Sequence, residues 1–314
     1  MKTAPLVKWI AMLLTLIPAF SFALEQTPAH TKEFQPPVVH DRDFWRAIVR
    51  NGYAVPEKQQ AFPLVRELSS YLGSRDPELR DDLAYSIIAT WIVRQKQLSA
   101  SELGTLLDEW RANLRIGIGE SGTDSVLRRS FSALCLAALA RRDLKTPFLG
   151  EDRYRALLSN ALAYLSDERD LRGFDPALGW IHAIGHSADL LAELASNPLF
   201  RTDDQGRLLD AISQRLSSGL VIFTYGEQDR LASAAATIAG RPDFDAAVFQ
   251  RWLIALDGAD QKVWRDSPPK QDLLMAFEND TYMLRGLAAH LLMSPPNAAV
   301  AEAQKAVLGA LKSR

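Results

Sequence analysis

Apolar residues recur at helical spacing from Asp41 to the end of the chain, and no segment shows the strict alternation of a β-strand. Start and stop signals divide this pattern into about twelve helices in six pairs. The predicted helices lie near 41–51, 58–73, 77–96, 100–115, 122–142, 151–166, 177–196, 203–218, 227–239, 243–256, 271–293 and 297–312.

Several of these helix starts carry capping residues. Asp76 stands before a proline at a first helical position, and Ser99 with Glu102 forms a capping box. Thr202 with Gln205 predicts a second, weaker box. These local signals fix the expected bounds of the helices more closely than periodicity does.

The odd-numbered helices begin at intervals of roughly 45–55 residues, which is close to the period of two-helix repeats. Each has polar groups in its first turns, followed by a stretch rich in Ala and Leu. Stacked repeats would align these polar ends on one face. We therefore expect residues 41–314 to form a single all-α domain of tandem helical hairpins. Both an open α-solenoid of the HEAT type and a closed α/α ring fit the pattern.

The N-terminal segment has the features of a secretory signal. Lys2 and Lys8 precede an apolar run, and Ser21-Phe22-Ala23 is a small-x-small cleavage site. An uncleaved membrane anchor is the alternative, but the run is short for a span and contains Pro18. We expect a signal peptide at 1–23, a flexible leader at 24–40, a periplasmic or secreted protein, and no membrane span after cleavage.

Composition narrows the function classes. The formal net charge is -2, so no overall basic field favours nucleic acid as a partner. Cys135 is the only cysteine, which excludes an internal disulfide. It stands in an apolar helical run, so a buried, inert thiol is expected rather than a nucleophile.

The segment 179–189 holds the most suggestive group of polar residues. Spacings of four and three place His182, His186 and Asp189 on one face of the predicted helix 177–196. Two imidazoles and a carboxylate can bind a metal ion, with zinc as the expected ion if one is bound. A structural hydrogen-bond network is the favoured interpretation, and metal-free acid/base catalysis is the third. No cofactor is therefore expected, with zinc at these three residues as the alternative.

Two further segments carry acidic groups. Residues 117–122 match the glycine spacing of dinucleotide sites, but they follow a helix and no βαβ unit surrounds them. A turn that caps the next helix explains them, with Glu120 aimed at the shared face. In segment 225–230, Glu227 and Asp229 at a helix start fit the helix dipole, and pairing with arginines would give a structural ion network.

These segments supply the candidate site residues. The catalytic candidates are Glu120, His182, His186 and Glu227. The ligand-binding candidates are Asp81, Asp124, Arg128, Trp180, Asp229 and Arg230. Trp180 beside the histidines would suit a ring or sugar pocket, although packing in the core is the favoured explanation.

A set of short motifs gives a family resemblance. The motifs are Leu79-Arg80-Asp81-Asp82-Leu83-Ala84-Tyr85, Gly117-Ile118-Gly119-Glu120, Arg129-Ser130-Phe131-Ser132-Ala133-Leu134, Asp170-Leu171-Arg172-Gly173, Gly179-Trp180-Ile181-His182-Ala183, His186-Ser187-Ala188-Asp189-Leu190-Leu191 and Gly226-Glu227-Gln228-Asp229-Arg230-Leu231-Ala232. Together they resemble a bacterial family known only as domain of unknown function 2785, over about Asp41 to Leu256. The resemblance implies an all-helical protein and no particular activity, and the signal peptide departs from members expected in the cytosol.

Two functional hypotheses follow from these observations. The first is a binding or scaffold protein that presents a polar concave face to a peptide, protein or glycan. The second is a hydrolase acting on an envelope polymer or polar ester, possibly with a metal ion. The chain has no nucleophile elbow, phosphate loop or cysteine motif, which favours the first.

Overall fold

The computed structural model describes residues 40–314, and in that part of the chain the regular structure is helical apart from one short hairpin. The α-helices are α1 (Arg42–Arg50), α2 (Ala61–Ser70), α3 (Ser86–Ala89), α4 (Ala100–Asn113), α5 (Ser125–Lys145), α6 (Gly150–Asp167), α7 (Ala183–Ala195), α8 (Thr202–Leu216), α9 (Glu227–Ala239), α10 (Ala246–Asp260), α11 (Gln271–Met293) and α12 (Ala298–Lys312). The π-helical segments η2 (Glu78–Tyr85) and η3 (Thr90–Arg94) extend α3 at both ends, and together they fill the helix predicted at 77–96.

The N-terminal part of the chain is described from His40 onward. The predicted signal peptide 1–23 and leader residues 24–39 lie outside the described residues. His40, the last residue of the predicted leader, is described, and its Nδ1 lies 2.8 Å from Oε2 of Glu67. Within the described residues, no helix has the length and apolar character needed to cross a membrane.

The helix caps show why the bounds could be predicted so closely. The Asp76 carboxylate accepts hydrogen bonds from the backbone N–H groups of Glu78 and Leu79, as its place before Pro77 predicts. Ser99 and Glu102 form the predicted capping box. The box predicted at Thr202 and Gln205 is wrong. Asp204 accepts from the N–H of Arg201 there, while the Gln205 side chain donates to the Asp243 carbonyl.

The Ser99 cap gives a measurable prediction. Ser99→Ala should lower the free energy of unfolding by about 1 kcal/mol, because the N–H of Glu102 loses its acceptor. Urea denaturation followed by circular dichroism measures this. Ser159→Ala, an exposed position inside α6, is the control and should not lower stability. An equal loss in both variants would contradict a specific capping effect.

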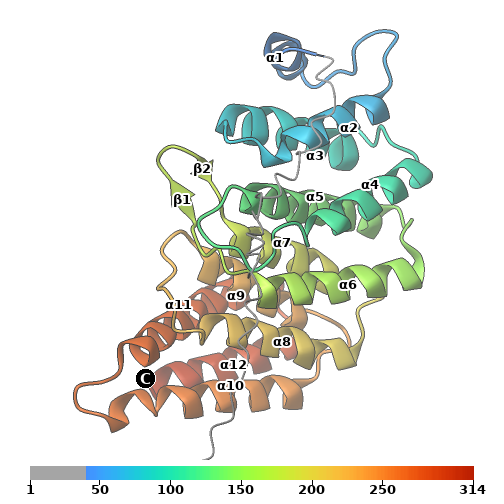
Figure 1. The fold of residues 1–314 in the computed structure, drawn as a ribbon. Helices are drawn as coiled ribbons and strands as arrows, with labels where there is room; N and C mark the ends of the chain where they lie inside the picture. Colours follow the sequence, from blue (N-terminus) through green and yellow to red (C-terminus); the bar gives the residue numbers. More distant parts are fainter. Residues whose placement is uncertain (1–39) are drawn as a thin grey trace, which may run out of the picture. The chain divides into compact units, whose positions relative to one another are not determined.

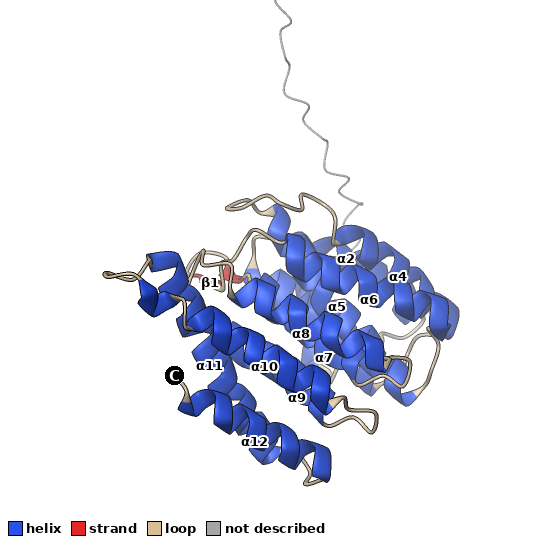
Figure 2. Cartoon of the chain, turned by 90° about the horizontal axis from the view of Figure 1, so that it is seen from below, coloured by secondary structure: helices blue, strands red, loops and turns tan. Residues whose placement is uncertain are grey.

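The helices form two adjoining rows. In one row α5 packs on α7, α7 on α9, and α9 on α11; in the other α6 packs on α8, α8 on α10, and α10 on α12. Figure 1 shows the succession from α1 to α12, and Figure 2 shows α6, α8 and α10 side by side in front of α5, α7 and α9. Sequential hairpins therefore bring the starts of the odd-numbered helices to a common edge.

One continuous hydrophobic core runs between the two rows, from Trp45 in the first helix to Val307 in the last. Trp91 Nε1 donates to the Tyr53 carbonyl at 2.7 Å, whereas the buried Nε1 of Trp45 has no hydrogen-bond partner. Cys135 lies fully buried in this core, and burial raises the pKa of its thiol. The prediction of a buried cysteine is confirmed.

The prediction that helix seven starts near residue 177 is wrong. Residues Phe174–Asp175 (β1) and Gly179–Trp180 (β2) form a small antiparallel hairpin, and α7 begins only at Ala183. The carboxylate of Asp175 accepts from the N–H groups of the two residues that follow Pro176 and so closes the turn. Gly179 then takes a positive φ of 70°, which ends the turn and prevents a helical start.

Candidate functional site

Three loops meet at the edge where α5, α7 and α9 begin. The first loop (114–124) joins α4 to α5, the second (168–182) joins α6 to α7, and the third (217–226) joins α8 to α9. The first and second are connected directly, because the N–H of Gly122 donates to Asp170 at 2.9 Å and Arg172 donates to the Thr123 carbonyl at 3.0 Å. The polar helix starts seen in the sequence thus lie on one surface.

A fully buried ion pair holds these loops in place. The Arg129 guanidinium meets both carboxylate oxygens of Glu168, with Nε–Oε2 at 2.8 Å and Nη2–Oε1 at 2.9 Å. Arg129 Nη1 also donates to the carbonyls of Ile116 and Gly117, each at 2.8 Å. Since Glu168 begins the second loop and Ile116 lies in the first, one guanidinium ties both loops to α5.

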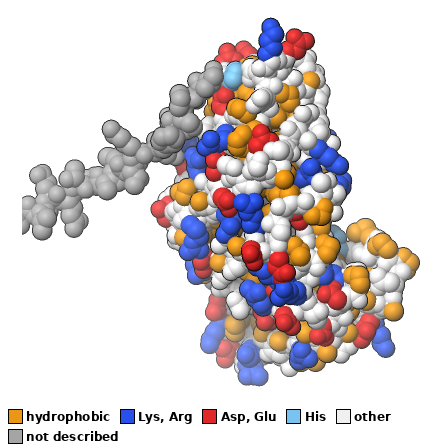
Figure 3. Space-filling view, turned by 90° about the vertical axis from the view of Figure 1, so that its right-hand side faces the viewer, with side chains coloured by type: hydrophobic (Ala, Val, Ile, Leu, Met, Phe, Trp, Pro, Cys, Tyr) orange, Lys and Arg blue, Asp and Glu red, His pale blue; other side chains and the backbone are white. Residues whose placement is uncertain are grey.

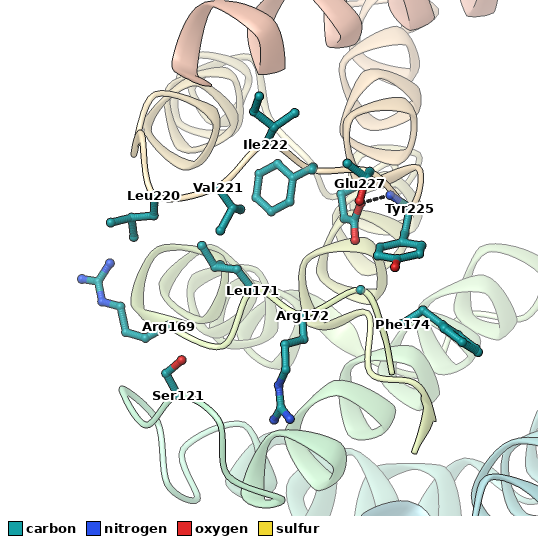
Figure 4. Close-up of a pocket in the computed structure, with 13 residues that line it drawn as sticks. Ser121, Arg169, Leu171, Arg172, Phe174, Leu220, Val221, Ile222, Tyr225 and Glu227 are labelled. Carbon is teal, nitrogen blue, oxygen red and sulfur yellow. Dashed lines mark hydrogen bonds between the residues drawn. The ribbon is translucent and has the colours of Figure 1, made fainter. Parts of the chain in front are cut away.

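The three loops enclose a pocket of about 530 Å³, which we call the loop-end pocket (Figure 4). This volume lies in the usual range for small-ligand sites. Its lining residues are Ser121, Arg169, Leu171, Arg172, Gly173, Phe174, Leu220, Val221, Ile222, Phe223, Thr224, Tyr225 and Glu227.

Large apolar side chains stand exposed around this pocket. Leu220 is 57% exposed and Ile222 42% exposed, and Phe174 and Tyr225 are exposed to a similar degree. These four residues come from two loops and form an apolar patch around the pocket. Exposing such a patch to water is unfavourable, so apolar patches of this kind mark binding sites. The four residues give the pocket the apolar rim of a binding site.

A close pair of titratable groups lies at the pocket wall, with Glu227 in the lining and His182 directly behind it. His182 Nε2 lies 3.6 Å from Glu227 Oε1, with both side chains buried. Glu227 Oε2 accepts the N–H of Tyr225 at 2.9 Å, whereas His182 Nε2 has no hydrogen-bond partner. Burial lowers the pKa of His182 to about 4 and raises the pKa of Glu227. The imidazole is therefore neutral. Among residues 40–314 the carboxylate has no cation in an ion pair with it, because Arg230, whose charge acts on both groups, pairs with Asp189.

The backbone around this pair is under tight constraint. His182 immediately precedes α7 and has a φ of 49°, a conformation uncommon outside glycine. A Cβ atom at Gly185 would lie 2.6 Å from His182 Nε2, and one at Gly173 would lie 2.5 Å from Glu227 Oε1. Such strain is concentrated at functional sites, where surrounding structure holds it in place. The Trp180 ring stacks on His182 with centroids 5.1 Å apart.

His186 belongs to the layer beneath and is structural. Its Nδ1 lies 2.8 Å from Ser130 Oγ, which donates to the Ile181 carbonyl at 2.5 Å. Because the single hydroxyl proton goes to that carbonyl, we assign the Nδ1–H tautomer, which donates to Ser130. Ser130 is fully buried, so it is not available as a nucleophile.

The predicted metal set is not assembled. His182 precedes the helix on which His186 and Asp189 lie, Nδ1 of His186 is bonded to Ser130, and Asp189 forms an ion pair with Arg230. Among residues 40–314, no group of three or more His, Cys, Asp and Glu side chains is arranged to hold a metal ion. Zinc binding through these residues stays a prediction from the sequence alone.

The other candidates make structural contacts outside the pocket. Glu120 accepts from Ser125 Oγ at 2.6 Å and so supports the start of α5. The remaining contacts are Asp81 with Arg80, Asp124 with Arg75, Asp229 with His290, and the Arg128 side chain against Gly73. Of the sequence candidates, Glu227 lines the pocket and His182 with Trp180 lies directly behind it.

Sequence reasoning missed most of the pocket lining. Arg169, Leu220 and Ile222 were outside every segment singled out, and Leu171 appeared only within a motif of the family resemblance. The available signal was the run Leu220-Val221-Ile222-Phe223, which is apolar although it joins two helices. A continuous apolar run in a connecting loop indicates either a buried loop or a ligand surface.

Figure 3 shows how charged side chains are distributed over one face of the described residues. On the face drawn in Figure 3, basic and acidic side chains are interspersed over the surface. This agrees with the net charge of -2 and with the many ion pairs of the described residues.

Comparison with known proteins places this architecture in a family. Residues 114–289, more than half of the chain, match the family described as protein of unknown function (DUF2785). The matched region begins with the first loop and contains all three loops and the whole loop-end pocket. No curated protein and no solved structure gives a match. The chain belongs to the DUF2785 family.

Proposed function

We propose that this protein is a binding protein that takes its ligand in the loop-end pocket. The observation that carries this is the combination of an exposed apolar rim with a buried carboxylate that has no cationic partner. Burying a carboxylate without such a partner is costly, and a ligand group that pairs with it would offset the cost. The fully buried Arg129–Glu168 pair supports the same proposal, because it preforms the loops before any ligand arrives.

We also infer that the hairpins form an open stack of the α-solenoid type and not a closed ring. Contacts run from each helix to its successor in the same row. In Figure 1 the first and last hairpins lie at opposite ends of that succession. An open stack leaves the loop edge accessible along its length, as a binding surface requires.

An apolar anionic dye, 8-anilinonaphthalene-1-sulfonate, tests the binding proposal. We expect wild type to enhance its fluorescence and the double variant Leu220→Asp with Ile222→Asp to lose most of that enhancement, since the apolar rim disappears. Leu292→Asp is the matched control, because Leu292 on α11 is 73% exposed but lies outside the pocket. Equal dye binding by the double variant and wild type would overturn the proposal.

A hydrolase is the second candidate, supported by one observation. A neutral imidazole 3.6 Å from a carboxyl group with a raised pKa is an arrangement suited to general acid/base work. Turnover of peptide, glycan or ester substrates, lost in Glu227→Gln but kept in Asp229→Asn, would favour it. Turnover unaffected by Glu227→Gln would exclude this pair from the reaction.

The export proposal has its own test. We propose that the signal is cleaved after Ala23 and that the protein is periplasmic or secreted, as Lys2, Lys8 and the apolar run indicate. Mass spectrometry of the protein from its native host should find Leu24 as the first residue. A mature chain that still carries Met1 or Lys2 would contradict cleavage.

A further inference from the structure

The loop-end pocket has an uncompensated positive charge on one side. Arg169 lines the pocket and is exposed, and among residues 40–314 it forms no ion pair. Arg215, buried nearby, is bound only by the carbonyls of Leu165 and Ser166, and its Nη1 has no hydrogen-bond partner. Burial and the charge of Arg169 lower the pKa of Arg215 to about 10. The nearest strong acid, Glu168, is already committed to Arg129.

The other side of the pocket has the opposite property. Glu227 is buried and lies 3.6 Å from the His182 imidazole. The charge of Arg230 also acts on Glu227, but the Arg230 guanidinium is ion-paired with Asp189. Since His182 is neutral, no cation is ion-paired with the carboxylate, and the His182 Nε2 beside it has no hydrogen-bond partner. A ligand ammonium group would pair with the carboxylate.

Apolar side chains separate these two ends. Figure 4 shows Arg169 on one side and Glu227 with Tyr225 on the other, with Leu171 and Val221 between them. Arg172, the other cation of the lining, is paired with Asp170. The charges left without an ion pair are therefore a cation at one end and an anion at the other, with apolar surface between them. A ligand that matches this lining has a carboxylate, an apolar middle and an ammonium group.

We propose that the loop-end pocket binds a short apolar peptide with free termini, its carboxylate at Arg169 and its amino group at Glu227. The proposal rests on the binding function proposed above and names its ligand class. A fatty acid would satisfy only Arg169, and a polyamine only Glu227. An extended tripeptide spans roughly 10 Å, a length suited to a small-ligand pocket.

Calorimetric titration of the full chain with the tripeptide Leu-Ala-Leu tests this. We expect measurable binding to wild type, at least tenfold weaker binding of the N-acetylated peptide, and at least tenfold weaker binding of the C-terminal amide. Octanoate, an apolar anion without an amino group, should bind at least tenfold more weakly than the free tripeptide.

Two variants connect each peptide terminus with its residue. Glu227→Gln should weaken the free tripeptide but leave the acetylated form unchanged, and Arg169→Gln should do the same with the amide. Asp229→Asn on the same helix and Arg66→Gln on α2 make the same charge changes outside the pocket and should leave all affinities as in wild type. Thermal melting checks that each variant folds, and the capped peptides on wild type test the proposal even where one does not.

The outcomes separate the two proposals. Equal affinity for free and capped peptides, or octanoate binding as tight as the tripeptide, overturns the ligand class. If the dye still reports the Leu220 and Ile222 rim while the peptides fail to bind, the ligand class is wrong and the binding function stands. If neither dye nor peptide responds to pocket variants, both proposals fail.

Discussion

Glu168→Gln should lower the free energy of unfolding by about 3–5 kcal/mol, because it leaves the Arg129 guanidinium buried without its counter-charge. Both side chains are 0% exposed, so water cannot replace the lost carboxylate. The amide would also turn N–H groups toward the N–H donors of Arg129. Chemical denaturation monitored by circular dichroism measures the loss.

The neighbouring residue supplies the control for this prediction. Asp167 pairs with Arg115 at 2.7 Å, with side chains 45% and 54% exposed. Asp167→Asn should cost less than about 1 kcal/mol, because exposed pairs are screened by water. Similar losses for Asp167→Asn and Glu168→Gln would show that the buried pair does not hold the loops as described.

Glu168→Gln should also weaken ligand binding in the loop-end pocket. Arg129 connects the first loop to the second through Glu168 and the carbonyls of Ile116 and Gly117. A variant that is still folded at low temperature would therefore have a less ordered pocket. We expect weaker dye binding in Glu168→Gln than in Asp167→Asn under those conditions.

The helical elements could be predicted because their signals are local. The Asp76 cap and the Ser99–Glu102 box each lie within four residues, and a helix needs only its own sequence to satisfy them. Most predicted bounds therefore agree with the observed ones to within a few residues. The arrangement of the polar helix starts on one edge followed from the repeat spacing.

The hairpin at 174–180 was missed because its signal competes with a strong helical one. Ala, Leu and Ile recur at helical spacing from residue 177, yet Asp175 closes a turn and Gly179 has a positive φ. His182 consequently lies before the helix and faces Glu227 instead of continuing a stripe with Asp189. Local turn chemistry decided the position of the central site residue.

The pocket itself could not be predicted from spacing. Arg169 and Leu220 are distant in sequence and meet only because α6 and α8 pack side by side in one row. Glu227 was singled out for its place at a helix start, but nothing in the sequence shows that it is buried without a cation. Burial and missing partners are tertiary properties, and these two properties define the site.

The free energy of unfolding of wild type, relative to that of His182→Asn, should fall as the pH is lowered. Burial lowers the pKa of His182 from 6.5 to about 4, so the folded protein resists protonation that the unfolded chain accepts. Acidification from about pH 6.5 toward pH 4 therefore favours unfolding of wild type. The expected relative loss is about 1.4 kcal/mol per pH unit and about 3 kcal/mol in total.

The comparison with a variant is needed because other groups act in the opposite direction. Burial raises the pKa of Asp81 and Asp260 to about 6, and the pKa of Glu227 is also raised, so acidification favours the folded state at these positions. These carboxyl groups are present in both proteins and largely cancel in the difference. Asparagine is chosen because it tolerates the positive φ of 49° at this position and does not titrate.

Urea denaturation at several pH values between 4.5 and 7.5 gives the difference between the two free energies of unfolding. His290→Gln is the control, since this histidine is half-buried on α11 beside the exposed Asp229. The wild-type disadvantage should grow steadily below about pH 6.5 for the His182 pair and much less for the His290 pair. Parallel curves for wild type and His182→Asn would mean that His182 is not held neutral, and would remove the reason for an unpaired Glu227. A steeper curve for the His182 pair would show that the imidazole beside Glu227 stays neutral in the folded protein.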